Sequence, residues 1–149
     1  MNSVIPVAAQ QAGGSHGPGS AGVAGILSTE ELNLLHRLAH ALYTRGAYDD
    51  AVRYFWFLCL HAPTDTRYLK GLGASLFMAR RFGEAVVTYS FLTMLAPRDA
   101  EVQCMCGHAL LMNGEVQDAR ACLDYAARIP GGKPEFVARA RALLELISG

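Results

Sequence analysis

The chain has 149 residues, enough for one domain with a core of its own. Hydrophobic residues make up 52% and charged residues only 17%, with 13 basic side chains balancing 13 acidic ones. A chain without net charge has no field to draw it to nucleic acid, and no apolar run reaches the roughly 18 residues of a membrane-spanning helix. We therefore expect neither a nucleic-acid-binding nor a membrane protein.

Residues 1–27 are predicted to form a flexible, glycine-rich arm. They include six glycines and no Asp, Glu, Lys or Arg, so little favours a packed structure. The arm lacks the positively charged start and compact apolar run of a secretory signal, and we expect none. The cysteines lie inside predicted helices and are expected to be free thiols, as in a reducing cytoplasm. They are Cys59, Cys104, Cys106 and Cys122.

Ordered structure is predicted to begin at Ser28, which has capping-box spacing with Glu31. Apolar residues follow at helical spacing, and small residues then return every 34 positions. This period marks the tetratricopeptide repeat, a helix–turn–helix unit. The recurring positions are Ala39, Gly73 and Gly107, then Leu42, Leu76 and Leu110, then Ala51, Ala85 and Ala119, then Phe55, Tyr89 and Leu123.

The period divides residues 28–133 into three repeats, at 32–65, 66–99 and 100–133. The small residue in the first helix of each repeat is expected to let the second helix approach closely.

The turns and the end of the chain support this division. Gly46 and Gly114 are expected to end the first helix of the first and third repeats with a positive φ, whereas the second repeat has no glycine at that offset. Residues 134–149 are predicted to form a capping helix that begins at Pro134. The predicted fold is all-α: three tandem tetratricopeptide repeats in a right-handed superhelix with a C-terminal capping helix.

Stacked repeats of this type form a concave groove, lined mainly by the first helix of each pair, and such grooves bind peptides. Fixed offsets within each repeat give the side chains expected to face it. They are Asn33, His36, His40, Tyr43 and Thr44, then Arg67, Lys70, Ala74, Phe77 and Met78, then Glu101, Cys104, His108, Leu111 and Met112. Apolar groups with a few donors suit an extended peptide. The alternative is that Phe77 and Leu111 only complete the core.

Metal binding and catalysis find little support. His36 and His40 share a helix face, as do Cys104 and His108, but a structural zinc site needs four convergent ligands. The chain has no glycine-rich phosphate loop and no nucleophile motif. We expect no metal, no cofactor and no enzyme. The alternative from another class, a metal-dependent or thiol enzyme, would require bound zinc or a reactive cysteine.

Between the small-residue positions lie more specific segments, which a generic repeat protein would not share. They are Phe57–Cys59, Tyr68–Ala74, Ala85 with Tyr89–Ser90, Leu110–Leu111 with Gly114–Glu115, and Pro134–Phe136. In these segments the chain resembles the class II chaperones of bacterial type III secretion, the translocator chaperones of the SycD/LcrH type. The resemblance runs from about residue 32 to residue 147.

The resemblance implies a cytoplasmic bacterial chaperone that binds hydrophobic, pore-forming translocator proteins in its groove and keeps them soluble and secretion-competent. The resemblance also allows a homodimer and a transcription activator as a second partner. Relatives often carry aromatic residues where this chain has His36 and His40. The two histidines are expected to make the groove of this chain titratable. By matching, the groove residues would be His36, His40, Tyr43, Lys70, Ala74, Phe77 and His108.

Two alternatives of the same fold stay open: a generic tetratricopeptide adaptor or scaffold, and a chaperone for needle subunits of the secretion system. Adaptors that capture a C-terminal carboxylate line their groove with several Lys, Arg and Asn side chains. Here Arg67 and Lys70 are the candidates, so such a clamp is incomplete.

Overall fold

The computed structural model describes residues 27–149, and these form seven α-helices without a β-strand. The arm predicted for residues 1–27 lies outside the described residues, except for Leu27. None of the described helices is long and apolar enough to cross a membrane. The helices are α1 (Thr29–Thr44), α2 (Tyr48–His61), α3 (Thr66–Met78), α4 (Phe82–Leu95), α5 (Ala100–Met112), α6 (Val116–Arg128) and α7 (Pro134–Ser148).

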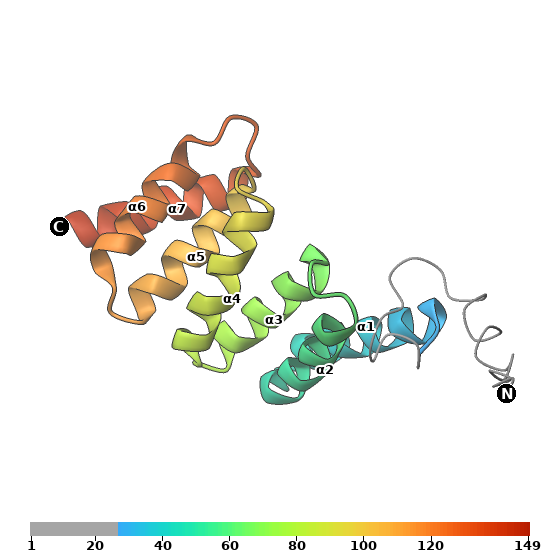
Figure 1. The fold of residues 1–149 in the computed structure, drawn as a ribbon. Coiled ribbons are helices and arrows are strands. Elements are labelled where there is room, and N and C mark those ends of the chain that lie inside the picture. Colours follow the sequence, from blue (N-terminus) through green and yellow to red (C-terminus); the bar gives the residue numbers. More distant parts are fainter. Residues whose placement is uncertain (1–26) are drawn as a thin grey trace, which may run out of the picture.

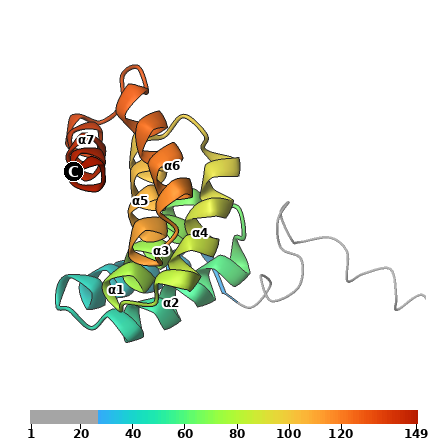
Figure 2. The ribbon, with the colours of Figure 1, turned by 90° about the vertical axis from the view of Figure 1, so that its left-hand side faces the viewer.

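The helices stack in chain order. Each helix packs against the next, and α1 also contacts α3 while α5 contacts α7, which is the pattern of stacked helix pairs. Figure 1 shows them following one another along the array, and in Figure 2 α1 and α7 project on the same side. The concave face therefore lies on the side of α1, α3, α5 and α7.

Close helix approach depends on the small residues of the repeat. A Cβ atom on Gly73 would lie 2.8 Å from the ring of Tyr89, and one on Gly107 would lie 2.6 Å from Cγ of Leu123. Tyr89 and Leu123 belong to α4 and α6, the second helices of the same repeats. The close approach predicted at Gly73 and Gly107 is therefore confirmed.

The turns between paired helices need a left-handed residue. Gly46 has φ +82° and Gly114 has φ +86°, as predicted. In the second repeat, where glycine is missing, Arg80 takes φ +61° instead. Its guanidinium lies over the ring of Phe82, 5.6 Å from the centroid. This contact offsets part of the roughly 1–2 kcal/mol that the conformation costs an L-residue.

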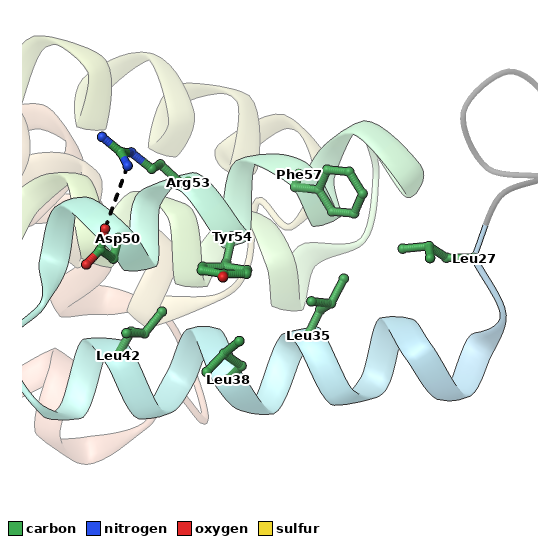
Figure 3. A pocket seen from close by; sticks show the side chains of 8 residues that line it. All are labelled: Leu27, Leu35, Leu38, Leu42, Asp50, Arg53, Tyr54 and Phe57. Atoms are coloured by element: carbon green, nitrogen blue, oxygen red, sulfur yellow. Dashed lines mark ion pairs between the residues drawn. The ribbon is translucent and has the colours of Figure 1, made fainter.

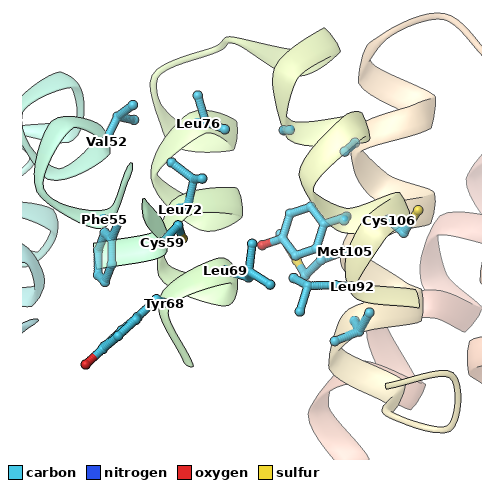
Figure 4. Packing of buried hydrophobic residues seen from close by; sticks show 14 of the residues in the cluster. Val52, Phe55, Cys59, Tyr68, Leu69, Leu72, Leu76, Leu92, Met105 and Cys106 are labelled. Carbon is cyan, nitrogen blue, oxygen red and sulfur yellow. The ribbon is translucent and has the colours of Figure 1, made fainter. Parts of the chain in front are cut away.

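The core is one main cluster that runs from α1 to α6, with a smaller cluster under α7. Figure 4 shows part of the main cluster, with Leu69, Leu92 and Met105 between α3, α4 and α5. Gln103, the polar residue at an apolar repeat position, is buried, and its amide donates to the carbonyl of Pro97 at 3.0 Å. The hydrogen bond removes most of the penalty of burying this side chain.

Candidate functional site

A pocket of about 470 Å³ opens on the concave face. Five of the seven predicted groove residues line it together: His36, His40, Tyr43, Lys70 and Ala74. The other lining residues are Phe55, Arg67, Gly71, Glu101 and Lys133. The pocket therefore joins α1, α3 and the start of α5, which are far apart in the sequence.

The floor of this pocket is aromatic. Phe55 of α2 is only 1% exposed, and its ring meets His36 and His40 edge-on, at centroid distances of 5.9 and 5.3 Å. Gly71 makes this possible, because a Cβ atom there would overlap the Phe55 ring. The ring of Tyr68 lies 5.1 Å from that of His36 and continues the apolar wall.

The ring of His36 is uncharged at neutral pH. His36 is half-buried, and its Nε2 has no hydrogen-bond partner within the described part of the chain. Burial, then the neighbouring His40 and Arg67, hold the pKa of His36 below its ordinary value. A side chain that resists protonation presents an apolar ring face to a ligand.

The cations of the pocket are already paired within the chain. Lys70 Nζ donates to Asp99 Oδ2 at 2.7 Å and to Glu101 Oε2 at 3.2 Å, and Lys133 Nζ donates to the same Glu101 oxygen at 2.9 Å. Arg67 pairs with Asp65, 2.8 Å between Nη2 and Oδ2. Because the three cations that line the pocket are paired with carboxylates of the chain itself, they offer little free positive charge to the C-terminal carboxylate of a ligand.

The last two predicted groove residues lie next to each other, outside the lining of the pocket. The rings of Phe77 and His108 are 4.6 Å apart, and both side chains are half-buried. Phe77 also packs against the main core. Burial, with a contribution from the charge of Arg139, lowers the pKa of His108 to about 4, and His108 Nδ1 has no partner among the described residues.

Sequence reasoning missed three residues that line this pocket: Phe55, Gly71 and Lys133. Phe55 comes from a second helix, Gly71 has no side chain, and Lys133 lies in the turn before α7. Arg139 of α7 reaches back to α5, with Nη1 3.6 Å from the sulfur of Met105.

A signal for Arg139 was present in the sequence. It lies three residues after Phe136 and four before Leu143, so helical spacing places it on the apolar stripe of the last helix. A charged residue on an apolar stripe lies on the side of the helix that packs against its neighbour, which marks it as a candidate for a specific interaction.

Cys104, which the offsets placed in the groove, is instead fully buried beneath α7, and burial raises the pKa of its thiol to about 11. The prediction for this residue was wrong because the capping helix covers that part of α5. Within residues 27–149 no group of three or more His, Cys, Asp or Glu side chains could hold a metal ion.

Two further clefts lie away from the predicted groove residues, none of which lines them. A cleft of about 630 Å³ lies between α1 and α2 beside Leu27, with Arg53 and Asp50 at 3.9 Å on its rim (Figure 3). A second, of about 520 Å³, is lined by residues of α2, α3 and α4, among them Trp56 and Val87.

The depressed pKa of His108 predicts a loss of stability in acid. Its folded pKa of about 4 lies below the unfolded value of about 6.5, so the unfolded chain takes up the proton first as the pH falls. This contribution is fully present above pH 6.5 and is lost between there and about pH 4. Between pH 7 and pH 5 it amounts to about 1–2 kcal/mol.

Chemical denaturation of the wild type and His108→Gln at pH 7 and pH 5 measures this effect. The variant should lose less stability over that interval, because glutamine does not titrate, while His36 contributes equally to both proteins. Equal losses would show that His108 keeps its ordinary pKa in the folded chain.

The chain is similar in sequence and fold to known proteins. Residues 67–99 match the tetratricopeptide repeat family. The chain is 29% identical over 134 residues to the low calcium response locus protein H of Yersinia pseudotuberculosis, an alignment that covers 88% of this chain and 80% of that protein.

Two solved structures are similar over most of the chain. The first is the Yersinia enterocolitica type III secretion chaperone SycD in complex with a peptide of the translocator YopD: 30% identity, TM-score 0.74, covering 81% of this chain and 95% of that one. The second is PcrH, a Pseudomonas aeruginosa protein, in complex with the chaperone binding region of PopD: 27% identity, TM-score 0.75, covering 82% and 94%. The predicted fold class is thereby confirmed.

Proposed function

Because the chain belongs to the family of type III secretion chaperones that includes SycD, we propose that it binds the hydrophobic translocator proteins of such a system in the bacterial cytoplasm. A segment of each translocator occupies the concave groove, and the bound form stays soluble and competent for secretion. The observation that carries this function is the pocket over Phe55, on the face where tetratricopeptide proteins hold peptides.

The pocket fits an apolar anchor residue of an extended segment. Its wall includes the neutral ring of His36 beside Phe55, and its cations are neutralised by Asp65, Asp99 and Glu101. An apolar side chain that enters meets ring faces without having to strip water from an unpaired charge. Tyr43 and Lys70 also line the pocket. The Tyr43 hydroxyl and the remaining N–H of the Lys70 ammonium group are available to bond to the backbone of the segment.

Mass action supplies the chaperone effect. A groove that binds a translocator lowers the free energy of its soluble form by RT ln(1 + [L]/Kd), where [L] is the concentration of free chaperone, and it needs no ATP. Release at the secretion apparatus requires a reversible complex, and a short segment that orders on binding gives up part of its contact energy to that ordering. The chain acts by binding, and we assign it no catalytic step.

Co-expression with the products of the same secretion gene cluster, followed by affinity purification of this chain, tests the function. We expect a protein with long apolar helices to co-purify and to precipitate when the chaperone is omitted. Recovery of a small needle-like subunit alone would favour the needle-chaperone alternative. Recovery of neither would exclude a role in secretion. A homodimer and a transcription activator stay predictions, which the mass and the composition of the purified complex also test.

A further inference from the structure

We propose that Arg139 forms a carboxylate-binding subsite of the groove, which takes an Asp or Glu side chain of the bound segment. This inference rests on the proposed function, because the subsite needs a segment in the groove. It adds a requirement on the ligand: an acidic residue to one side of the apolar anchor.

The charges around the groove balance except at Arg139. Arg67 is paired with Asp65, and Lys70 and Lys133 share Asp99 and Glu101. Arg139 has no carboxylate within ion-pair distance in the described part of the chain, and its one polar contact is the weakly accepting sulfur of Met105. Of these four cations, Arg139 alone makes no ion pair among the described residues.

The neighbours of Arg139 place it on the concave face. Arg139 contacts Met105 of α5, and its charge lowers the pKa of His108, also on α5. Its charge also acts on Tyr43, which belongs to α1 on the far side of the groove. Burial raises the pKa of the Tyr43 hydroxyl, and the charge of Arg139 acts against that rise. A segment that lies over Tyr43 and continues toward α7 would pass Arg139.

The surroundings strengthen the attraction once a segment binds. Burial lowers the pKa of His108 and raises that of the Tyr43 hydroxyl, so both side chains are uncharged at neutral pH and neither adds a charge beside Arg139. A bound segment excludes water, and a guanidinium–carboxylate pair is worth more in the resulting lower dielectric.

The other arginines at this end of the array have structural roles that Arg139 lacks. Arg120 donates to the carbonyl of Ile147 at 2.9 Å and to Ser148 Oγ at 3.0 Å, which ties α6 to the end of α7. Arg141, also on α7, donates to the carbonyl of Ala127 at 3.4 Å. Arg139 is exposed and bound to none of these, so its donors are free for a ligand.

The test uses short fluorescein-labelled peptides that tile the translocators of the same gene cluster, each made as a free acid and as a C-terminal amide. Binding to the full chain is followed by fluorescence anisotropy. We expect the tightest peptides to contain an internal Asp or Glu, and Arg139→Gln to weaken their binding about tenfold. The salt dependence of binding should fall as well. Arg139→Lys should retain part of the affinity, and Arg141→Gln, the matched control, should leave it unchanged.

Neutralising the acidic residue of the peptide separates the sources of the carboxylate. The Asp→Asn or Glu→Gln peptide should bind wild type and Arg139→Gln equally, and amidation of the C-terminus should have no effect. If amidation instead removes the difference, the group bound is a chain terminus and the inference is wrong. Equal binding by wild type and Arg139→Gln, or tight peptides without an acidic residue, also overturns it while the proposed function stands. If neither peptides nor whole translocators bind the wild type, both fail.

Discussion

Replacing Phe55 with alanine is expected to lower the free energy of unfolding by about 3–5 kcal/mol, because it removes a fully buried ring and leaves a cavity. Phe55 is 1% exposed and lies in the main core cluster, with His36 and His40 against its edge. Since the ring is also the pocket floor, the cavity would open toward the groove. Urea denaturation, followed by far-UV circular dichroism, measures the loss.

Gly71 provides an internal check on this expectation. Alanine in place of a helical glycine is ordinarily favourable by up to about 1 kcal/mol, but at Gly71 the added Cβ would overlap the Phe55 ring. We expect Gly71→Ala to destabilise the wild type by about 1–3 kcal/mol through overpacking. In the Phe55→Ala background the obstacle is gone, and the same methyl group partly fills the cavity.

The two substitutions together should therefore cost clearly less than the sum of their separate effects, a coupling that a double-mutant cycle measures. Gly83→Ala is the matched control, because the nearest atom to its added Cβ would be Asn113 Oδ1 at 3.7 Å. That substitution should be neutral or stabilising in both backgrounds. Additive costs at Phe55 and Gly71 would mean that the backbone of α3 does not sit against the ring.

The repeat period was sufficient to predict the helices and their close approach. Gly73 and Gly107 stand at the same offset because the two helices of each repeat pack equally closely there. The same constraint is therefore visible in each of the three repeats of one chain. The turns followed the same logic, except that Arg80 replaces the missing glycine at the cost of a strained φ. That substitution follows no local sequence rule, because only the geometry of the flanking helices requires it.

The site was less predictable, because it depends on residues that differ between repeats. Position 71 is glycine in the second repeat, but the corresponding positions are Arg37 and Met105, so no average over repeats suggests contact with a ring. The offsets also assign the groove to first helices, whereas Phe55 enters from α2 and Arg139 from α7. The histidines were expected to make the groove titratable, but burial lowers the pKa of His36, and burial depends on tertiary packing that the sequence does not show.

Filling the pocket should abolish binding without harming the fold. Ala74 lines the pocket, whose volume is about 470 Å³, and is half-buried. An indole at this position would enter the pocket and exclude the anchor residue of a bound segment. We expect Ala74→Trp to weaken binding of a translocator segment by at least about thirtyfold, the loss produced by removing one strong hot-spot contact. Isothermal titration calorimetry with the tightest peptide measures it.

The effect on stability should be small, below about 1 kcal/mol, because the new side chain enters a space open to solvent. Ala121→Trp is the matched control: Ala121 is exposed on α6 and lies outside the pocket lining, so the same change of side chain there should leave affinity unaltered. Full binding by Ala74→Trp would move the segment to another surface, and the clefts beside α2 would then be the places to look. Loss of binding in Ala74→Trp with retention in Ala121→Trp would place the anchor over Phe55. If the segment then continues past Tyr43 toward α7, Arg139→Gln should lower the affinity of a longer segment further. If the segment ends before α7, Arg139→Gln should have no effect.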